Sequence, residues 1–479
     1  MTVTLNSRAD FTLEAARRVA WEGEGVVLGE SSRKAMAAAR ARFMALIDEP
    51  DVTIYGVTSG YGQNARVRLD PDQRKAHANR PPFPAAASWG DPVPERVARA
   101  IVFARLANFV EGHAAVTPAV AEGVAAMLDG GPLPEVPARG QGGAGEILSL
   151  SHLFLPLARS MELAEKDSLS LVNGSPAATG LSVDAALAGA ARLEVAAEVL
   201  ALAAEAFNAP LGHFDEALED HWNNPHDAWA LARLRGLIDG GHGDARRPYQ
   251  APVSFRILPR LLGQAHLAAE VTREVAEQSL PAVSDNPALL APDAAHPNGR
   301  AVSTGGFHNA QAPMVLDMLT ASYANLCVLA GRHAAKMMDG NVSLLPPQLG
   351  AGEGRAYVGC LPMAITGYEE EARMLASATL IPGSESGGFG QNDAASPVFL
   401  AWSKQERAGV LLEQSLAALA PVALLALDIT NRPVPGPLAA VAEATRTHVP
   451  VDRQGLLGPA TAELAGWLRG RVYGGESLG

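Results

Sequence analysis

The sequence predicts a mainly α-helical protein, built as a long helical bundle with a smaller, loop-rich N-terminal region of mixed α/β character. Hydrophobic residues make up 48% of the 479 residues and aromatic residues only 5%, so small and aliphatic side chains dominate. Apolar side chains recur at helical spacing over long stretches beyond residue 180. Glycine and proline signals separate these stretches, as is typical of helices joined by turns.

The N-terminal region, residues 1–180, is expected to alternate helices with loops. Residues 11–47 have helical periodicity, and residues 52–55 (VTIY) have the composition of a short strand. The segment 56–62 (GVTSGYG) predicts a glycine loop, because glycine permits close backbone approach. After a proline-rich connection, a helix is expected at 94–110. A Gly/Pro-rich segment, 130–145, leads into another helix that begins near Glu146.

Long Ala/Leu/Glu helices are expected to fill the second region, residues 181–479. They cover residues 180–207, 259–279, 309–338, 357–379, 395–428 and 458–473. The helices at 309–338 and 395–428 are apolar around much of their circumference, which indicates burial on several sides. This pattern favours the interior of an oligomer, although a central helix within one chain would show it too.

Charge and cysteine content exclude several classes of protein. The chain carries 51 acidic and 38 basic residues, and its net charge of −13 argues against nucleic-acid binding. Neither Cys327 nor Cys360 belongs to a metal-binding motif, and both are expected to be buried apolar residues. There is no apolar signal segment at the N-terminus and no uncharged apolar run of about 18 residues, so we expect a soluble cytoplasmic protein without membrane partners.

Several short motifs, taken in order along the chain, resemble those of the histidine and aromatic amino acid ammonia-lyase family, which includes the aromatic aminomutases. Residues 55–62 (YGVTSGYG) resemble the family's YGVNTGFG loop, residues 172–175 (VNGS) its LNGT element, and residues 250–259 (QAPVSFRILP) its QDxYSxRxxP element. Further along the chain, residues 284–287 (SDNP) resemble its TDNP element, residues 305–308 (GGFH) its GNFH element, and residues 391–393 (QND) its QED element. Each match is modest, but their ordered combination is specific.

The resemblance implies a mostly helical homotetramer whose active sites are assembled from three subunits. The family uses no external cofactor. Its electrophile is a methylidene-imidazolone (MIO) ring, made when an Ala-Ser-Gly tripeptide cyclises and dehydrates. The ring accepts electrons from the substrate, a loop tyrosine removes the β-proton, and ammonia leaves from an α-amino acid.

The tripeptide region departs from the family pattern. This chain reads Gly143-Ala144-Gly145-Glu146-Ile147, where the family has G-A-S-G-D-L, so the serine is either deleted or replaced by glycine. Glycine has no β-carbon to supply the methylidene, so no self-derived ring is expected here. A tripeptide concealed under Ala144 is the alternative. Without the ring, the amides of Gly143 to Gly145 would become bare N–H donors for an oxyanion.

Other positions also depart from the family pattern. The family's tyrosine, aspartate, asparagine and glutamate are replaced here by Val253, Ala251, Gly306 and Asn392. Its S-E-N signature is absent, and residues 369–371 are three consecutive glutamates instead. Consecutive helical residues point about 100° apart, so at most one or two of them can face a cavity. A solvated helix face is the alternative interpretation of that run.

The retained residues suggest a working site. Tyr55 matches the loop tyrosine that acts as base, a role that requires a pKa lowered from its usual value of about 10. Arg256 matches the arginine that holds the substrate carboxylate, for which a planar guanidinium is suited. Asn173 matches the asparagine beside the ring. From the residues alone, a core aromatic, a surface salt bridge and a turn cap remain open as their respective roles.

Further residues complete the predicted substrate site. His77 falls near the family's SHAAG histidine, Gln391 keeps its place in the QED element, and Phe307 matches a wall contributed by another subunit. His308 is equally typical of a hydrogen-bonded core histidine. Val253 and Gly306 replace larger side chains and imply a cavity of altered shape. No metal site is expected.

Three functions remain open from the sequence. The favoured one is an enzyme without the MIO ring, which performs elimination, isomerisation or cyclisation on an amino-acid-derived carboxylate through Tyr55. The second is a conventional ammonia-lyase whose ring is concealed in the sequence. The third is a catalytically silent relative that binds a ligand. Fold alone does not choose among them.

Overall fold

The computed structural model describes residues 2–60, 64–80, 83–240, 246–247, 249–350, 358–381, 390, 392–450 and 455–474. The chain forms two compact units. Unit 1 consists of Met1–Ala186, Thr272–Met314 and Thr379–Ser403, and unit 2 consists of Leu187–Val271, Val315–Ala378 and Lys404–Gly479. The internal segments 272–314 and 379–403 therefore join the N-terminal part of the chain.

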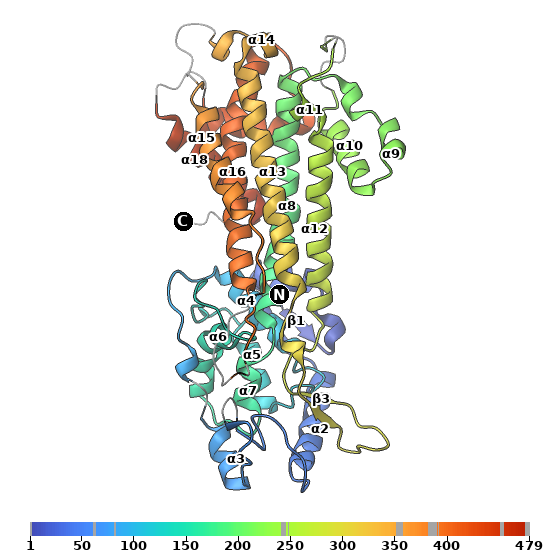
Figure 1. Cartoon of the computed structure of the whole chain (residues 1–479), viewed down its shortest axis with the longest axis vertical. Helices are drawn as coiled ribbons and strands as arrows, with labels where there is room; N and C mark the ends of the chain where they lie inside the picture. The colour runs from blue at the N-terminus through green and yellow to red at the C-terminus, as the bar shows by residue number, and fades with distance from the viewer. Residues whose placement is uncertain are drawn as a thin grey trace. The chain divides into compact units, whose positions relative to one another are not determined.

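Unit 1 combines short helices with two small sheets. Its helices are α1 (Leu13–Ala20), α2 (Glu30–Ile47), α3 (Pro71–Ala78), α4 (Glu95–Ala107), α5 (Pro118–Ala126), α6 (Ile147–Arg159) and α7 (Asp167–Val172) (Figure 1). Strand β1 (Thr2–Leu5) pairs in parallel with β2 (Gly25–Leu28), and β3 (Ala288–Leu290) pairs antiparallel with β4 (Arg300–Val302). From Val97 onward α4 is buried on every side, as its apolar sequence predicts.

Two predicted elements of this unit are wrong. The helical stretch 11–47 is divided by β2, which aligns Gly25 with Thr2 and Leu28 with Leu5. The strand expected at 52–55 is absent, and that segment leads into a turn. The carbonyl of Ile54 accepts the amides of Val57 and Thr58, and the Thr58 hydroxyl accepts the Ile54 amide at 2.7 Å. Such local side-chain bonds compete with strand pairing.

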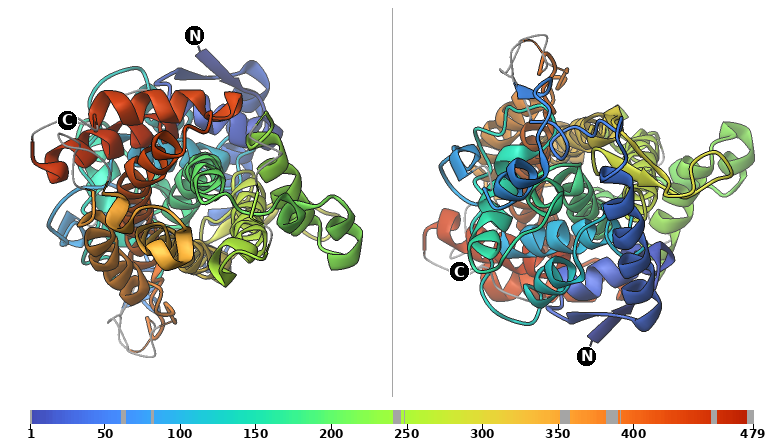
Figure 2. Two further views of the ribbon diagram at one scale, coloured as in Figure 1. Left: turned by 90° about the horizontal axis from the view of Figure 1, so that it is seen from above. Right: turned by 90° about the horizontal axis from the view of Figure 1, so that it is seen from below.

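Unit 2 is dominated by long helices. The chain adds α8 (Pro176–Ala206), α9 (Ala217–Trp222), α10 (Pro225–Leu237), α11 (Val253–Arg256), α12 (Leu258–Ser279), α13 (Gln311–Met338), α14 (Gly340–Ser343), α15 (Leu361–Leu375), α16 (Val398–Ile429), α17 (Ala439–His448) and α18 (Leu457–Val472). Helices α8, α12, α13 and α16 contain residues of both units. Figure 1 shows them from the side and Figure 2 along their axes. The predicted long helices and the mainly α-helical fold class are confirmed.

Small residues let the helices of unit 2 approach closely. A Cβ on Gly409 of α16 would lie 2.4 Å from the Arg192 guanidinium carbon of α8, so a side chain at residue 409 would displace that guanidinium. That guanidinium is fully buried, and it donates to Glu413 at 2.8 Å and to the Tyr473 hydroxyl at 2.7 Å. A charged network thus joins three helical segments within an apolar bundle.

Two helical segments, Gly305–Met338 and Val398–Ile429, are long and apolar enough to cross a membrane by length and composition alone. Their most apolar windows are 67% and 89% buried inside the chain, so core packing accounts for their composition. The expectation for the cysteines is half right, because Cys327 is buried whereas Cys360 is exposed at the start of α15.

Candidate functional site

The glycine loop that precedes α6 is fixed on both sides. The carbonyl of Gly143 accepts the amide of Ser396 at 3.1 Å. The side-chain amide of Gln141 donates to the Ser88 hydroxyl at 2.9 Å and to the Pro137 carbonyl at 2.7 Å. Helix α6 then begins at Ile147, so the loop presents its backbone at a helix N-terminus. Such a position favours oxyanions because the first amides of a helix lack acceptors within it.

Gly145 brings two of the predicted site segments together. Its φ is +65°, in the left-handed region, and it is buried. A Cβ at this position would lie 3.2 Å from Cδ2 of Phe307 and 3.9 Å from the carbonyl oxygen of Gly174. Phe307, expected as a wall from another subunit, therefore lies against the glycine loop of its own chain. A side chain at this position would require the Phe307 ring to move.

Asn173 ends α7 and is almost fully buried. Its side-chain NH₂ donates to the carbonyl of Asn286 at 2.6 Å, and its side-chain oxygen accepts the Gly174 amide at 2.8 Å. These bonds correspond to the turn-capping role left open by the sequence. The next residue, Ser175, donates its amide to the Ser284 hydroxyl at 3.0 Å. The Asn173 turn and the SDNP segment therefore form one rigid framework.

A buried charge cluster lies beneath this framework. Arg105, which is fully buried, donates to the carbonyl of Asn173, and its guanidinium lies 3.8 Å from the Asp285 carboxylate. Asp285 also pairs with Lys166 and accepts the Ser170 hydroxyl at 3.0 Å. Burial lowers the pKa of both Lys166 and Arg105, while the Asp285 charge opposes that shift. The cluster holds the Asn173 carbonyl in place.

Glu146, the residue after Gly145, caps a second helix. Its two carboxyl oxygens accept the amides of Ala177 and Ala178 at 2.5 and 2.6 Å, in the first turn of α8. Burial raises the pKa of Glu146 to about 8, although those amides and the Arg105 charge act in the opposite direction. The start of α6 is thereby tied to the start of α8.

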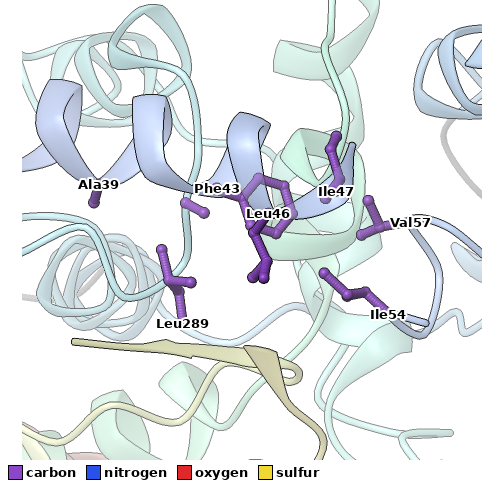
Figure 3. Packing of buried hydrophobic residues seen from close by; sticks show 8 residues of the cluster. Ala39, Phe43, Leu46, Ile47, Ile54, Val57 and Leu289 are labelled. Atoms are coloured by element: carbon purple, nitrogen blue, oxygen red, sulfur yellow. The ribbon is translucent and has the colours of Figure 1, made fainter. Parts of the chain in front are cut away.

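Tyr55 lies half-buried at a turn whose neighbours anchor it. Ile54 and Val57, on either side, belong to a buried apolar cluster with Phe43 of α2 and Leu289 of β3 (Figure 3). Leu289 lies two residues after the SDNP segment, so the tyrosine turn and the Asn173 framework share one apolar support. Residues 61 and 62, at the end of the predicted loop, lie outside the described residues.

The remaining unit 1 candidates sit on short elements. His77 is half-buried on α3, and burial lowers the pKa of its imidazole, with Arg80 acting in the same direction. Phe307 closes a short 3-10 turn, in which the Thr304 hydroxyl accepts the Gly306 amide at 3.1 Å. Asn392 is described and half-buried, whereas Gln391 lies outside the described residues.

Arg256 and Val253 belong to unit 2, on α11. Val253 is 57% exposed. Arg256 donates through Nε to the carbonyl of Ala251 at 3.1 Å, and within the described part of the chain it forms no ion pair. Phe255 between them stacks on His333 with ring centroids 3.9 Å apart, which fixes the short helix on α13. Arg256 can therefore offer its outer guanidinium nitrogens to a ligand.

The glutamate run on α15 has one inward-facing member. Glu369 is buried, and its carboxylate lies 3.7 Å from Arg373 and 3.9 Å from Arg332. Glu370 is exposed, and Glu371 pairs with Arg407 at 2.6 Å near the surface. The run is thus a solvated face except for Glu369.

Arg105, Lys166 and Ser396 were not predicted from the sequence, whereas Glu146 was predicted only as the end of the glycine loop and Asp285 only as part of the SDNP segment. A lone arginine in the apolar stretch of α4 was the available signal for Arg105, because a charge there requires a buried partner. Within the described part of the chain, no group of three or more His, Cys, Asp or Glu residues is arranged to hold a metal ion.

Comparisons with known proteins agree with the motif resemblance. The family model for aromatic amino acid lyases matches residues 11–448. Histidine ammonia-lyase from Streptomyces coelicolor is 31% identical over 468 residues, which cover 89% of this chain and 88% of that protein.

Two solved structures show the same fold. Ergothionase from Treponema denticola, an ergothioneine-degrading enzyme, superposes with a TM-score of 0.88 at 18% identity and covers 99% of both chains. Tyrosine aminomutase from Streptomyces globisporus superposes with a TM-score of 0.85 at 24% identity, covering 99% of this chain and 98% of that one. The predicted family placement is confirmed, and the chain belongs to the aromatic amino acid lyase family.

Proposed function

We propose that this protein is an enzyme of the lyase scaffold that works without the MIO ring and transfers protons on an amino-acid-derived carboxylate. The observation that carries the proposal is the presence and the conformation of glycine at position 145. It offers no β-carbon for a methylidene, its φ of +65° disfavours a side chain, and Phe307 fills the space beside it. The residues present do not fit the family's prosthetic ring, and the proposed reaction does not use one.

The absent electrophile restricts the substrate. A free α-amino acid has a weakly acidic β-proton and a poor leaving group in ammonia, and both problems are what an electrophilic ring solves. A substrate for this chain needs a more acidic proton or a better leaving group. Elimination, isomerisation and cyclisation are all reactions that such a substrate can undergo.

In this proposal Tyr55 accepts the substrate proton and Arg256 binds the carboxylate. The amides of Gly143, Ala144 and Gly145 stabilise negative charge that develops on substrate oxygen. Asn173, Phe307, Val253, His77 and Gln391 shape the pocket. The working form is a cytoplasmic homotetramer that shares active sites between subunits, without external cofactor, metal, nucleic-acid or membrane partners.

The test begins with the purified protein. Its intact mass should equal that of the encoded chain, without the loss of two waters that ring formation causes. It should lack the ring's near-ultraviolet absorbance and release no ammonia from histidine, phenylalanine or tyrosine. Rapid ammonia release from any of the three would refute the proposal and establish the second candidate, a conventional ammonia-lyase. That candidate is favoured by the 31% identity to a histidine ammonia-lyase.

A substrate screen then separates enzyme from silent relative. Derivatives of aromatic amino acids with better leaving groups or more acidic protons form the panel, and ergothioneine belongs to it because one structural relative degrades it. For any compound that is turned over, Tyr55→Phe and Arg256→Ala should each abolish most activity. If both variants instead retain the effect that the wild-type protein has in cells, the protein is a catalytically silent ligand-binding protein.

A further inference from the structure

A small hollow lies between the glycine loop and the start of α16. It is lined by Gln141, Gly143, Gly145, Glu146, Leu148, Ser149, Ser396, Val398 and Phe399. Its free space of about 10 Å³ is about that of one water-sized sphere, so it admits a single oxygen atom rather than a whole small molecule.

Ser396 has a hydroxyl with no role in the fold. The residue is 4% exposed, and its Oγ has no hydrogen-bond partner among the described residues. Its backbone amide is bound to the Gly143 carbonyl at 3.1 Å, which fixes the residue against the glycine loop. A buried hydroxyl without a hydrogen-bond partner lowers the stability of the fold. The Ser396 hydroxyl at this position therefore indicates that a ligand supplies the missing acceptor.

The other wall of the hollow is the N-terminus of α6, a helix of 13 residues. Leu148 and Ser149 occupy its second and third positions, and their amides bond no acceptor among the described residues. The first helical bond at this end runs from Leu150 to the Glu146 carbonyl. These amides point toward the space before the helix and favour negative charge there.

The apolar surroundings of the hollow strengthen the hydrogen bonds that the Ser396 hydroxyl and the α6 amides can donate. Val398 and Phe399 are buried and close the hollow with apolar side chains. Charge on an oxygen within a low-dielectric site gains more from fixed donors than it does in water. Glu146 turns its carboxyl oxygens to the amides of α8, so they are occupied as acceptors there.

We infer that Ser396 and the first amides of α6 form an oxyanion hole for a single substrate oxygen, which replaces the family's ring as the acceptor of substrate electrons. The inference rests on the proposed function, but it moves the oxyanion donors from the amides of Gly143 to Gly145 to Ser396 and α6. It also narrows the substrates to those whose transferred proton lies α to a carbonyl group. The base takes that proton as the C–H bond breaks. The electrons of that bond form a new C=C bond, and the π electrons of the carbonyl group move onto its oxygen. The resulting enolate oxygen occupies the hollow. A 2-oxo acid with an aromatic side chain has such a proton at its β-carbon.

The first experiment needs no turnover. It measures the affinity of the purified full-length protein for 4-nitrophenol and its phenolate by absorbance across a pH series. We expect the wild-type protein to prefer the phenolate. Ser396→Ala should reduce this preference about tenfold, the equivalent of one hydrogen bond. The matched control is Ser151→Ala, which removes another buried, unpartnered hydroxyl from α6, at a residue that does not line the hollow.

Stability provides a second readout. Because the Ser396 hydroxyl has no hydrogen-bond partner within the described part of the chain, Ser396→Ala should not lower the urea midpoint. The inference is overturned by equal phenolate preference in Ser396→Ala and wild type, by a wild type that binds no phenolate, by an equal loss in Ser151→Ala, or by a lower midpoint in Ser396→Ala.

Turnover separates this inference from the proposed function. With phenylpyruvate in D₂O, deuterium exchange at the β-carbon should be accelerated by the protein, and Ser396→Ala should lower kcat at least tenfold with little change in KM. If the phenolate results hold while Tyr55→Phe changes no activity on any compound, the proposed function fails and the oxyanion hole stands.

Discussion

Replacement of Gly145 by alanine tests whether this position accepts any side chain. A non-glycine residue with φ of +65° costs about 1–2 kcal/mol. The new Cβ would lie 3.2 Å from Cδ2 of Phe307, closer than ordinary van der Waals contact, and displacement of that ring costs about 1 kcal/mol more. Alanine also restricts the unfolded chain, which returns about 0.4–1 kcal/mol. The free energy of unfolding should therefore fall by about 1–3 kcal/mol.

Gly142→Ala is the matched control, because it adds the same methyl group in the same loop. A Cβ there meets no atom within 4 Å, and Gly142 has no positive φ. Its unfolding free energy should change by no more than about 0.5 kcal/mol. Urea denaturation followed by circular dichroism measures both variants, and equal slopes allow the midpoints to be compared. Equal stabilities of the two variants would refute the geometric argument against a side chain at residue 145.

Three further predictions concern buried charges. Between pH 4.5 and 8 the folded state binds more protons at Glu146 than the unfolded state does. The free energy of unfolding should therefore fall by a few kcal/mol as the pH rises through that window. Glu146→Gln should reduce this pH dependence in urea titrations. Lys166→Met should cost about 3–5 kcal/mol because it breaks a buried ion pair and leaves the Asp285 carboxylate with the more distant Arg105 guanidinium, whereas Lys34→Met, in an exposed pair, should cost under about 1 kcal/mol; equal losses in thermal melts would contradict this. Glu369→Gln should destabilise more than Glu370→Gln, since only the first is buried, and equal urea midpoints would show otherwise.

The long helices could be predicted because their evidence is local. A periodic apolar pattern over 20 or more residues, ended by glycine or proline, gave α8, α12, α13 and α16 to within a few residues. The parallel strand β2 could not be found in this way. It has four residues, and its partner β1 begins 23 residues earlier in the chain, so nothing near it in the sequence distinguishes it from the adjacent helices.

The candidate site was only partly predictable for the same reason. The motif resemblance identified Gly145, Asn173 and Phe307 as members of a site. The contact between Gly145 and Phe307 joins residues 162 positions apart, and the bond from Arg105 to Asn173 spans 68. Ser396 has no sequence signal at all. Its meaning comes from a buried hydroxyl without a partner, which only three-dimensional packing reveals.

Two features of the site are less favourable to stability than apolar packing would be. A buried cluster of Arg105, Asp285 and Lys166 is often no more stable than apolar side chains of the same volume. The Ser396 hydroxyl is buried and has no hydrogen-bond partner in the part of the chain that the structure describes. Both features are associated with the loops that meet at Gly145, where the family builds its electrophile. Stability sacrificed around one loop is the pattern of a working site, because a protein selected only for packing would replace such groups. This favours an enzyme with altered chemistry over a silent helical relative.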